Sequence, residues 1–146
     1  RKVVKKEKVA KDTYSFYFSA KQNFDFLPGQ YVRMILDIEK PDNRGNSRFF
    51  TIASSPLEKD YIMITTKIIR SSFKKKLLEL KTGENIKFFG PIGGFVFDDN
   101  IKDERVFLAG GIGITPFHSM ITYAFKIRPI TPRRKQTPLH RRMPAG

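Results

Sequence analysis

The sequence predicts a mainly β fold with one internal helix, followed by the beginning of an α/β unit. Three observations lead to this prediction. Short runs such as residues 14–19 alternate in side-chain character, which is typical of strands with one buried face. Turn-forming stretches such as FLPGQ and PDNRGNS separate these runs. After residue 104, an apolar run, a glycine-rich turn and a helical pattern follow one another.

The β part covers about residues 1–100. Its strand-like segments are rich in β-branched and aromatic residues and read YVRMILDI, FFTIAS, YIMITTKI and NIKFFG. Repeated short strands of this kind predict a small antiparallel barrel or sandwich. One segment differs, because Phe73, Leu77 and Leu80 recur at helical spacing after two serines and before Gly83. We therefore expect a helix at about residues 73–80.

The α/β unit begins at about residue 105. Residues 105–109 read RVFLA, and after Arg105 they are apolar without alternation, as expected for a strand that is covered on both faces. Thr115 suits the N-cap and Pro116 the first position of a helix that reaches about Phe125. Four prolines then fall within the last 20 residues, which favours disorder. The expected parts are a β domain at 1–103, an incomplete α/β unit at 104–126 and a disordered basic tail at 127–146.

Composition narrows the functional classes. The net charge is +14, but half of it falls in the last 23 residues, and no aromatic or zinc-binding motif interleaves the charges there, so nucleic-acid binding is not favoured. The absence of Cys excludes disulfides and thiolate metal sites, and it fits a reducing, cytoplasmic location. No apolar run reaches the ~20 residues of a membrane span, which leaves peripheral membrane association open.

Three sequence patches carry a family resemblance. They are FLPGQYV with SRFFTIASSP, then SSFKKKLLELKTGENIKFFGPIGGF, then VFLAGGIGITP. In this order they resemble the ferredoxin–NADP reductase superfamily of flavoproteins, over about residues 2–123. The resemblance implies a six-stranded antiparallel Greek-key barrel that binds FAD, followed by a Rossmann-like domain for NAD(P)H. It also implies an FAD-dependent oxidoreductase that passes electrons through flavin N5 to ferredoxin, another iron–sulfur or haem protein, or a small acceptor.

The resemblance assigns flavin contacts to the sequence RFFT. Arg48 would bind the pyrophosphate, for which its planar fork of donors is suited. Phe50 would stack on the isoalloxazine, where the family usually has Tyr, and Thr51 would place its hydroxyl near N5 as the catalytic residue. Phe49 is expected to fill the core instead.

Further FAD contacts are expected on the next strand and at the start of the internal helix, where unpaired N–H groups favour an anion. These residues are Thr65, Lys67, Ser71, Ser72 and Phe73. Thr66 is a further candidate, although strand alternation and simple serine capping explain the same residues. Residues 74–76 are expected to form a solvated face, and Gly93 and Phe95 are expected to be structural.

The glycine turn matches the NAD(P)-binding turn of the family, where backbone approaches phosphate at a helix N-terminus. The residues expected to bind NAD(P) are Gly110, Gly111, Gly113, Thr115 and Pro116. His118, His140, Asp98 and Asp99 receive no catalytic role, and no metal site is expected.

The expected second domain is incomplete, because a typical domain of this kind needs roughly another hundred residues. We therefore expect a truncated chain, whose change of composition in the tail fits a frameshift or a truncated gene, with FAD binding retained and NAD(P)H turnover poor. The alternatives are a non-catalytic flavin-binding or β-barrel interaction module and a basic nucleic-acid binder. The sequence does not identify the electron acceptor or distinguish NADH from NADPH.

Overall fold

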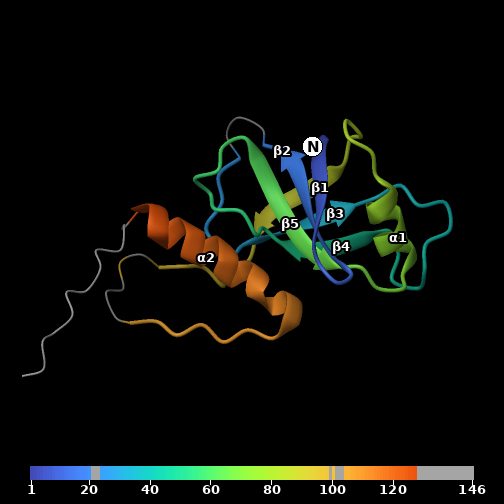
Figure 1. The fold of residues 1–146 in the computed structure, drawn as a ribbon. Coiled ribbons are helices and arrows are strands. Elements are labelled where there is room, and N and C mark those ends of the chain that lie inside the picture. The colour runs from blue at the N-terminus through green and yellow to red at the C-terminus, as the bar shows by residue number, and fades with distance from the viewer. Residues whose placement is uncertain (21–23, 99, 101–103, 128–146) are drawn as a thin grey trace, which may run out of the picture.

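The structure is a computed structural model, and it describes residues 1–20, 24–98, 100 and 104–127. Apart from Ile127, the tail that is expected to be disordered lies outside the described residues, as do Asp99 and His140. Figure 1 shows the elements in chain order. They are β1 (Val3–Ala10), β2 (Thr13–Ser19), β3 (Tyr31–Ile35), β4 (Ser47–Thr51), β5 (Tyr61–Lys67), α1 (Ser72–Glu79), β6 (Lys87–Ile92), the short 3-10 helix η1 (Gly111–Gly113) and α2 (Ile114–Ile127).

The strands form two antiparallel sheets of three strands each, in the orders β1-β2-β5 and β4-β3-β6. Backbone hydrogen bonds join the sheets at both edges. Beyond the end of β4, Ala53 N donates to Met63 O at 2.8 Å, and at the other edge Val3 N donates to Glu84 O at 2.9 Å. The strands therefore follow one another around a barrel as β1-β2-β5-β4-β3-β6, which confirms the predicted six-stranded antiparallel barrel.

Alternation along the strands builds the core of this barrel. On β2, Phe16 and Phe18 are fully buried, whereas Tyr17 between them is only half-buried. Helix α1 adds Phe73 and Leu77 to the same core. Ser71 caps the helix, because its Oγ accepts a hydrogen bond from Lys74 N at 3.1 Å. The predicted internal helix is thus confirmed within a residue at each end.

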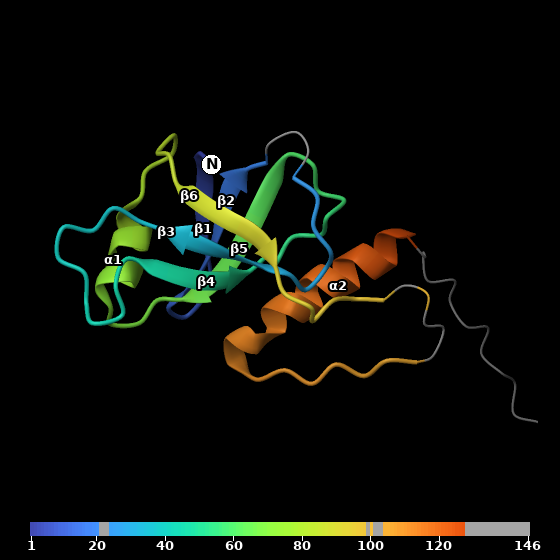
Figure 2. The same cartoon turned by 180° about the vertical axis from the view of Figure 1, so that it is seen from behind.

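Helix α2 packs on the barrel at the end opposite α1, as the two views in Figures 1 and 2 show. Ser119 Oγ donates to Ser54 O at 2.7 Å, and His118 Nδ1 lies 2.7 Å from Ala53 O. Gly29, whose φ is +102°, lies beneath the segment that leads toward α2, and it must be glycine because a Cβ there would lie 2.2 Å from Phe95 O. Helix α2 is therefore anchored to the segment that directly follows β4.

The strand expected at residues 105–109 does not form. Val106 and Leu108 are 85% and 86% exposed, whereas the ring of Phe107 contacts that of Phe117 on α2 with centroids 4.9 Å apart. A strand needs a neighbour for its N–H and C=O groups, and within the described residues no ladder partner lies beside this segment. The α/β part thus consists of an extended segment, a turn and α2.

Candidate functional site

The site begins at Arg48, on the inner face of β4. Its side chain is only 8% exposed, although most arginines lie at the surface. Nη2 donates to Asp42 Oδ1 at 2.9 Å. Nη1 donates to the carbonyl oxygens of the preceding turn, at distances between 2.7 and 3.0 Å, and these belong to Arg44, Gly45 and Ser47. The buried guanidinium is therefore held at the junction of β4 and the β3–β4 loop.

The N-terminus of α1 lies beside this guanidinium. Ser72 N donates to Asp42 Oδ2 at 3.2 Å, and Asp42 N donates back to Ser72 Oγ at 2.9 Å. Partial desolvation raises the pKa of Asp42, but hydrogen bonds from Arg44 N–H, Arg48 and Ser72, with the charge of Arg48, hold it below its ordinary value. One carboxylate thus bridges Arg48 and the start of the helix.

Aromatic rings and a lysine complete this cluster. The ring of Phe50, 7% exposed, lies 5.9 Å from that of Phe73 between centroids. Lys74 Nζ lies 4.6 Å above the centroid of Phe50 and donates to Thr66 Oγ1. Lys74 therefore points inward, and the expectation that residues 74–76 form a solvated face is wrong for this lysine.

The environment of Lys74 is unfavourable for its charge. Burial, followed by the positive charges of Arg48 and Arg44, lowers the pKa of Lys74 to about 8. The cluster therefore contains three cations close to the single carboxylate of Asp42. An arrangement of this kind favours a bound anion with more than one negative charge.

We expect Lys74→Met to increase the free energy of unfolding near neutral pH and to flatten its dependence on pH. The folded pKa of about 8 lies below the ordinary 10.5, so between these values the unfolded state binds more protons. The contribution of Lys74 to stability should therefore rise with pH across this window, with the full penalty present below it. Urea unfolding at about pH 7 and about pH 9.5 measures the difference. Lys75→Met, at the exposed neighbouring position, is the control, and equal pH slopes in wild type and Lys74→Met would contradict the prediction.

Thr51 lies at the end of β4, on the rim of an open cavity. The cavity has a volume of about 320 Å³ and is lined by Tyr31, Phe49, Phe50 and Thr51. Tyr31 and Phe49 meet edge to face, with centroids 5.6 Å apart. Phe49 is 62% exposed, so the expectation that it fills the core is wrong. An open, aromatic-lined cavity is suited to a planar ring system.

The predicted residues on β5 divide between its two faces. Thr66 is buried and contacts Lys74, so it joins the cluster. Thr65 points the other way, where its Oγ1 lies 2.8 Å from Ser15 Oγ, and Lys67 is exposed. The structure therefore brings together Arg48, Phe50, Ser72 and Phe73 with the cap residue Ser71, but it does not bring Thr65 to this cluster.

The glycine turn lies next to β5, and helix α2, which follows it, is bonded to the segment after β4. Gly111 has a φ of +53°, and Gly113 N donates to Gly110 O at 3.0 Å. Helix α2 starts at Ile114, so Thr115 and Pro116 lie inside its first turn and Thr115 is not the N-cap. Its Oγ1 instead donates to Ile112 O at 3.1 Å. The turn is solvent-exposed, as a phosphate-binding turn must be.

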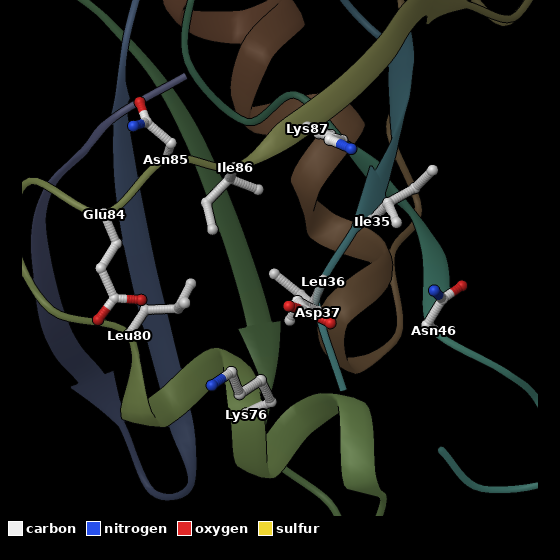
Figure 3. A pocket seen from close by; sticks show the side chains of 10 residues that line it. All are labelled: Ile35, Leu36, Asp37, Asn46, Lys76, Leu80, Glu84, Asn85, Ile86 and Lys87. Carbon is white, nitrogen blue, oxygen red and sulfur yellow. The ribbon is translucent and has the colours of Figure 1, made fainter. Parts of the chain in front are cut away.

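A larger cavity of about 560 Å³ lies on the other flank of α1 (Figure 3). Lys76 points into it from α1, and Asp37 lies opposite, at the start of the β3–β4 loop. The ten lining residues include none of those that the sequence predicts to bind a cofactor. We therefore place the candidate site at Arg48, Phe50 and Thr51 and not here.

The sequence interpretation missed Asp42 and Lys74. Asp42 lies within PDNRGNS, which indicates only a turn, and its partner Ser72 lies 30 residues further along the chain. Lys74 belongs to a run of three lysines whose pattern does not show which one turns inward. Lys74 directly follows Phe73, a core residue in the same turn of α1, and this position was the signal in the sequence that Lys74 lies near the core.

Comparison with known proteins identifies the family. Residues 1–97 match the family model of the oxidoreductase FAD-binding domain, which is more than half of the chain. The chain belongs to this family, and the resemblance to the ferredoxin–NADP reductase superfamily is confirmed. FAD is the cofactor of the family, and the clustered cations beside an aromatic-lined cavity are groups that fit its phosphates and its rings.

Relatives of known name match most of this chain. The glycine betaine monooxygenase reductase subunit of Pseudomonas aeruginosa is 36% identical over 132 residues, which cover 86% of this chain and 35% of that protein. Methane monooxygenase component C of Methylosinus trichosporium is 35% identical over 104 residues, or 70% of this chain and 29% of that protein. The chain thus spans about a third of the length of these relatives.

Solved structures show the same fold. Ferredoxin-NADP+ reductase from Plasmodium falciparum aligns with a TM-score of 0.72 at 21% identity, over 86% of this chain and 50% of that chain. The flavohem-like FAD/NAD binding domain of nitric oxide dioxygenase from Vibrio cholerae aligns with a TM-score of 0.70 at 21% identity, over 87% and 57%. At this identity the likeness concerns the fold alone. Neither α1 nor α2, nor any other helix among the described residues, is long and apolar enough to cross a membrane.

Proposed function

We propose that this chain is the FAD-binding part of a reductase that passes electrons from NAD(P)H to an electron acceptor. The observation that supports it most is the buried cluster of Arg48, Lys74 and the α1 N-terminus beside an open aromatic cavity. Arg48 and the N–H groups of α1 would hold the pyrophosphate, while Phe50 and Thr51 would hold the flavin rings. Bound FAD would supply hydride acceptance and the release of electrons.

The acceptor is proposed by chemical class only. The named relatives are the reductase subunit of one monooxygenase and component C of another, so an iron–sulfur or haem protein is the proposed recipient of electrons. The NAD(P)H site is proposed at residues 110–116, and Thr65 and Lys67 are proposed only as outer contacts of the cofactor. A cytoplasmic location stays a prediction from the cysteine-free sequence.

A non-catalytic barrel module is the second candidate. It is favoured by one observation, the exposure of Val106 and Leu108 together with Ile112 and Ile114 in the segment that leads to α2. A module of this kind would bind FAD without being reduced by NAD(P)H. The two candidates are therefore separated by whether the bound flavin accepts electrons from NAD(P)H.

We expect the 146-residue chain to bind FAD and to be reduced only slowly by NADH or NADPH, because the strand expected to lead into the glycine turn does not form and Val106 and Leu108 are exposed. The visible spectrum of the purified protein with added FAD measures binding, and anaerobic bleaching after NADH measures reduction. Photoreduction of the same sample is the control for a competent flavin. If the folded protein leaves the FAD spectrum and fluorescence unchanged, the proposed function is wrong.

A further inference from the structure

The carboxylate of Asp42 occupies a position with an unusual set of donors. Oδ1 accepts from Arg48 Nη2 at 2.9 Å and from Arg44 N at 3.0 Å, and Oδ2 accepts from Ser72 N at 3.2 Å. A guanidinium and the first N–H of a helix are the donors that proteins use to bind phosphate. Asp42 thus makes with its own two oxygens the contacts that a phosphate would make.

The same donors are those that the proposed function assigns to the FAD pyrophosphate, and this inference rests on that assignment. The backbone N–H of Ser72 has one hydrogen, so it cannot serve the carboxylate and a phosphate at full strength together, and the N–H of Arg48 Nη2 that points at Asp42 is likewise taken. A carboxylate left beside a pyrophosphate would also repel it. Phosphate binding at this place therefore requires Asp42 to move away.

Only the side chain of Asp42 has to move, because Arg48 Nη1 holds the loop backbone through the carbonyls of Arg44 and Gly45. Ile38 packs against the core and ties down the start of the loop, but residues 39–41, 43 and 44 are exposed. Gly45, with a φ of +71°, makes the turn that follows Asp42, and its N–H donates to Asp42 O at 2.8 Å. Figures 1 and 2 both show this loop reaching from the barrel to the side of α1. Asp42 thus lies in a surface loop with its side chain already partly exposed, and turning that side chain outward uncovers little apolar area.

We propose that Asp42 is an internal competitor for the phosphate-binding site and sets its affinity for FAD. With Asp42 seated, its carboxylate offsets part of the charge of the three cations in the cluster and satisfies the donors of Arg48 and α1. When a pyrophosphate arrives, its larger charge replaces the carboxylate, and the side chain of Asp42 turns outward into solvent while Arg48 Nη1 keeps its bonds to the carbonyls of Arg44 and Gly45. The affinity for FAD then depends on how much more strongly these donors bind the pyrophosphate than they bind the carboxylate of Asp42.

Asp42→Asn is the test, because it keeps the shape of the side chain and removes its charge. We expect Asp42→Asn to bind both FAD and inorganic pyrophosphate about tenfold more tightly than wild type, the size of effect that one charge-assisted hydrogen bond commands. Titration calorimetry and quenching of FAD fluorescence give the two affinities. Asp37→Asn, an exposed carboxylate at the start of the same loop, is the matched control and is expected to leave both unchanged.

The two ligands separate this proposal from the proposed function. If pyrophosphate binds Asp42→Asn more tightly than wild type while FAD binds neither protein, the competition is real and the FAD assignment is wrong. If Asp42→Asn binds pyrophosphate equally or more weakly than wild type, Asp42 is a positioning residue for Arg48 and the proposal is overturned.

A measurement on the wild-type protein covers the case in which the variant does not fold. During titration with pyrophosphate, the carboxyl carbon resonance of Asp42 is expected to shift toward that of a solvated aspartate, because it loses its three donors. An unchanged Asp42 resonance at saturating pyrophosphate would overturn the proposal.

Discussion

Arg48→Met is expected to weaken FAD binding by one to two orders of magnitude. Each hydrogen bond to a charged group is worth about 1.5–3 kcal/mol, and about 1.4 kcal/mol corresponds to a factor of ten in affinity. The guanidinium is buried and already aimed at an anion, since Asp42 Oδ1 lies 2.9 Å from Nη2, so little ordering is needed before it binds phosphate. Calorimetric or fluorescence titration of FAD against the folded variant measures the loss.

Arg33→Met is the matched control for this prediction. Arg33 also projects from the β3–β4 pair, but it is exposed and its Nε donates to Ser47 Oγ at 3.2 Å. Its removal should leave FAD affinity within about twofold, because exposed charges contribute little. Arg48→Met also removes the donors to the loop carbonyls, so circular dichroism must first show that the variant folds. If a folded Arg48→Met protein binds FAD as tightly as wild type, Arg48 does not contact the cofactor.

The side chains of β4 are buried and exposed in an order that the sequence analysis predicted wrongly at Phe49. Alternation places Arg48 and Phe50 on one face of the strand and Phe49 on the other. Ordinary preferences would bury the phenylalanine and expose the arginine, yet Arg48 is 8% exposed and Phe49 is 62% exposed. This reversal of the usual preferences is what a binding site at the barrel surface produces.

The barrel and α1 could be predicted because their signals are local. Period-two alternation fixes which residues of β2 face the core, and a serine cap with apolar residues at helical spacing fixes α1. The ion pair of Arg48 with Asp42 and the contact of Asp42 with Ser72 depend on how a loop folds back over a helix. Turn residues indicate that a loop exists but not where its side chains point, so Asp42 was invisible to sequence patterns.

The extended segment at residues 105–109 shows a different limit. Its apolar sequence is that of a strand covered on both faces, and such a strand exists only when neighbours supply hydrogen bonds and cover. In the described part of the chain, Val106 and Leu108 face solvent. The pattern therefore predicted a conformation that depends on partners outside the segment itself.

Phe73→Ala is expected to cause the largest loss of stability, about 3–5 kcal/mol in the free energy of unfolding, the usual cost of truncating a buried phenylalanine. Phe73 is fully buried, and its ring lies under the guanidinium of Arg48, with Cζ 5.1 Å from the ring centroid, and beside the ring of Phe50. Native domains are stable by only about 5–15 kcal/mol, so the variant should show a clearly lowered midpoint in urea or thermal unfolding.

Phe49→Ala is the matched control, since it removes the same atoms from an exposed position on β4. Its ring contacts Tyr31 edge to face, so a loss of less than about 1.5 kcal/mol is expected. The pair also separates the two uses of aromatic rings in this site. Phe73 supports Arg48 and Phe50 from within the core, whereas Phe49 lines the open cavity. Phe49→Ala should therefore reduce the free energy of FAD binding by more than it reduces the free energy of unfolding. Equal stability losses in the two variants would mean that Phe73 does not support the site from the core.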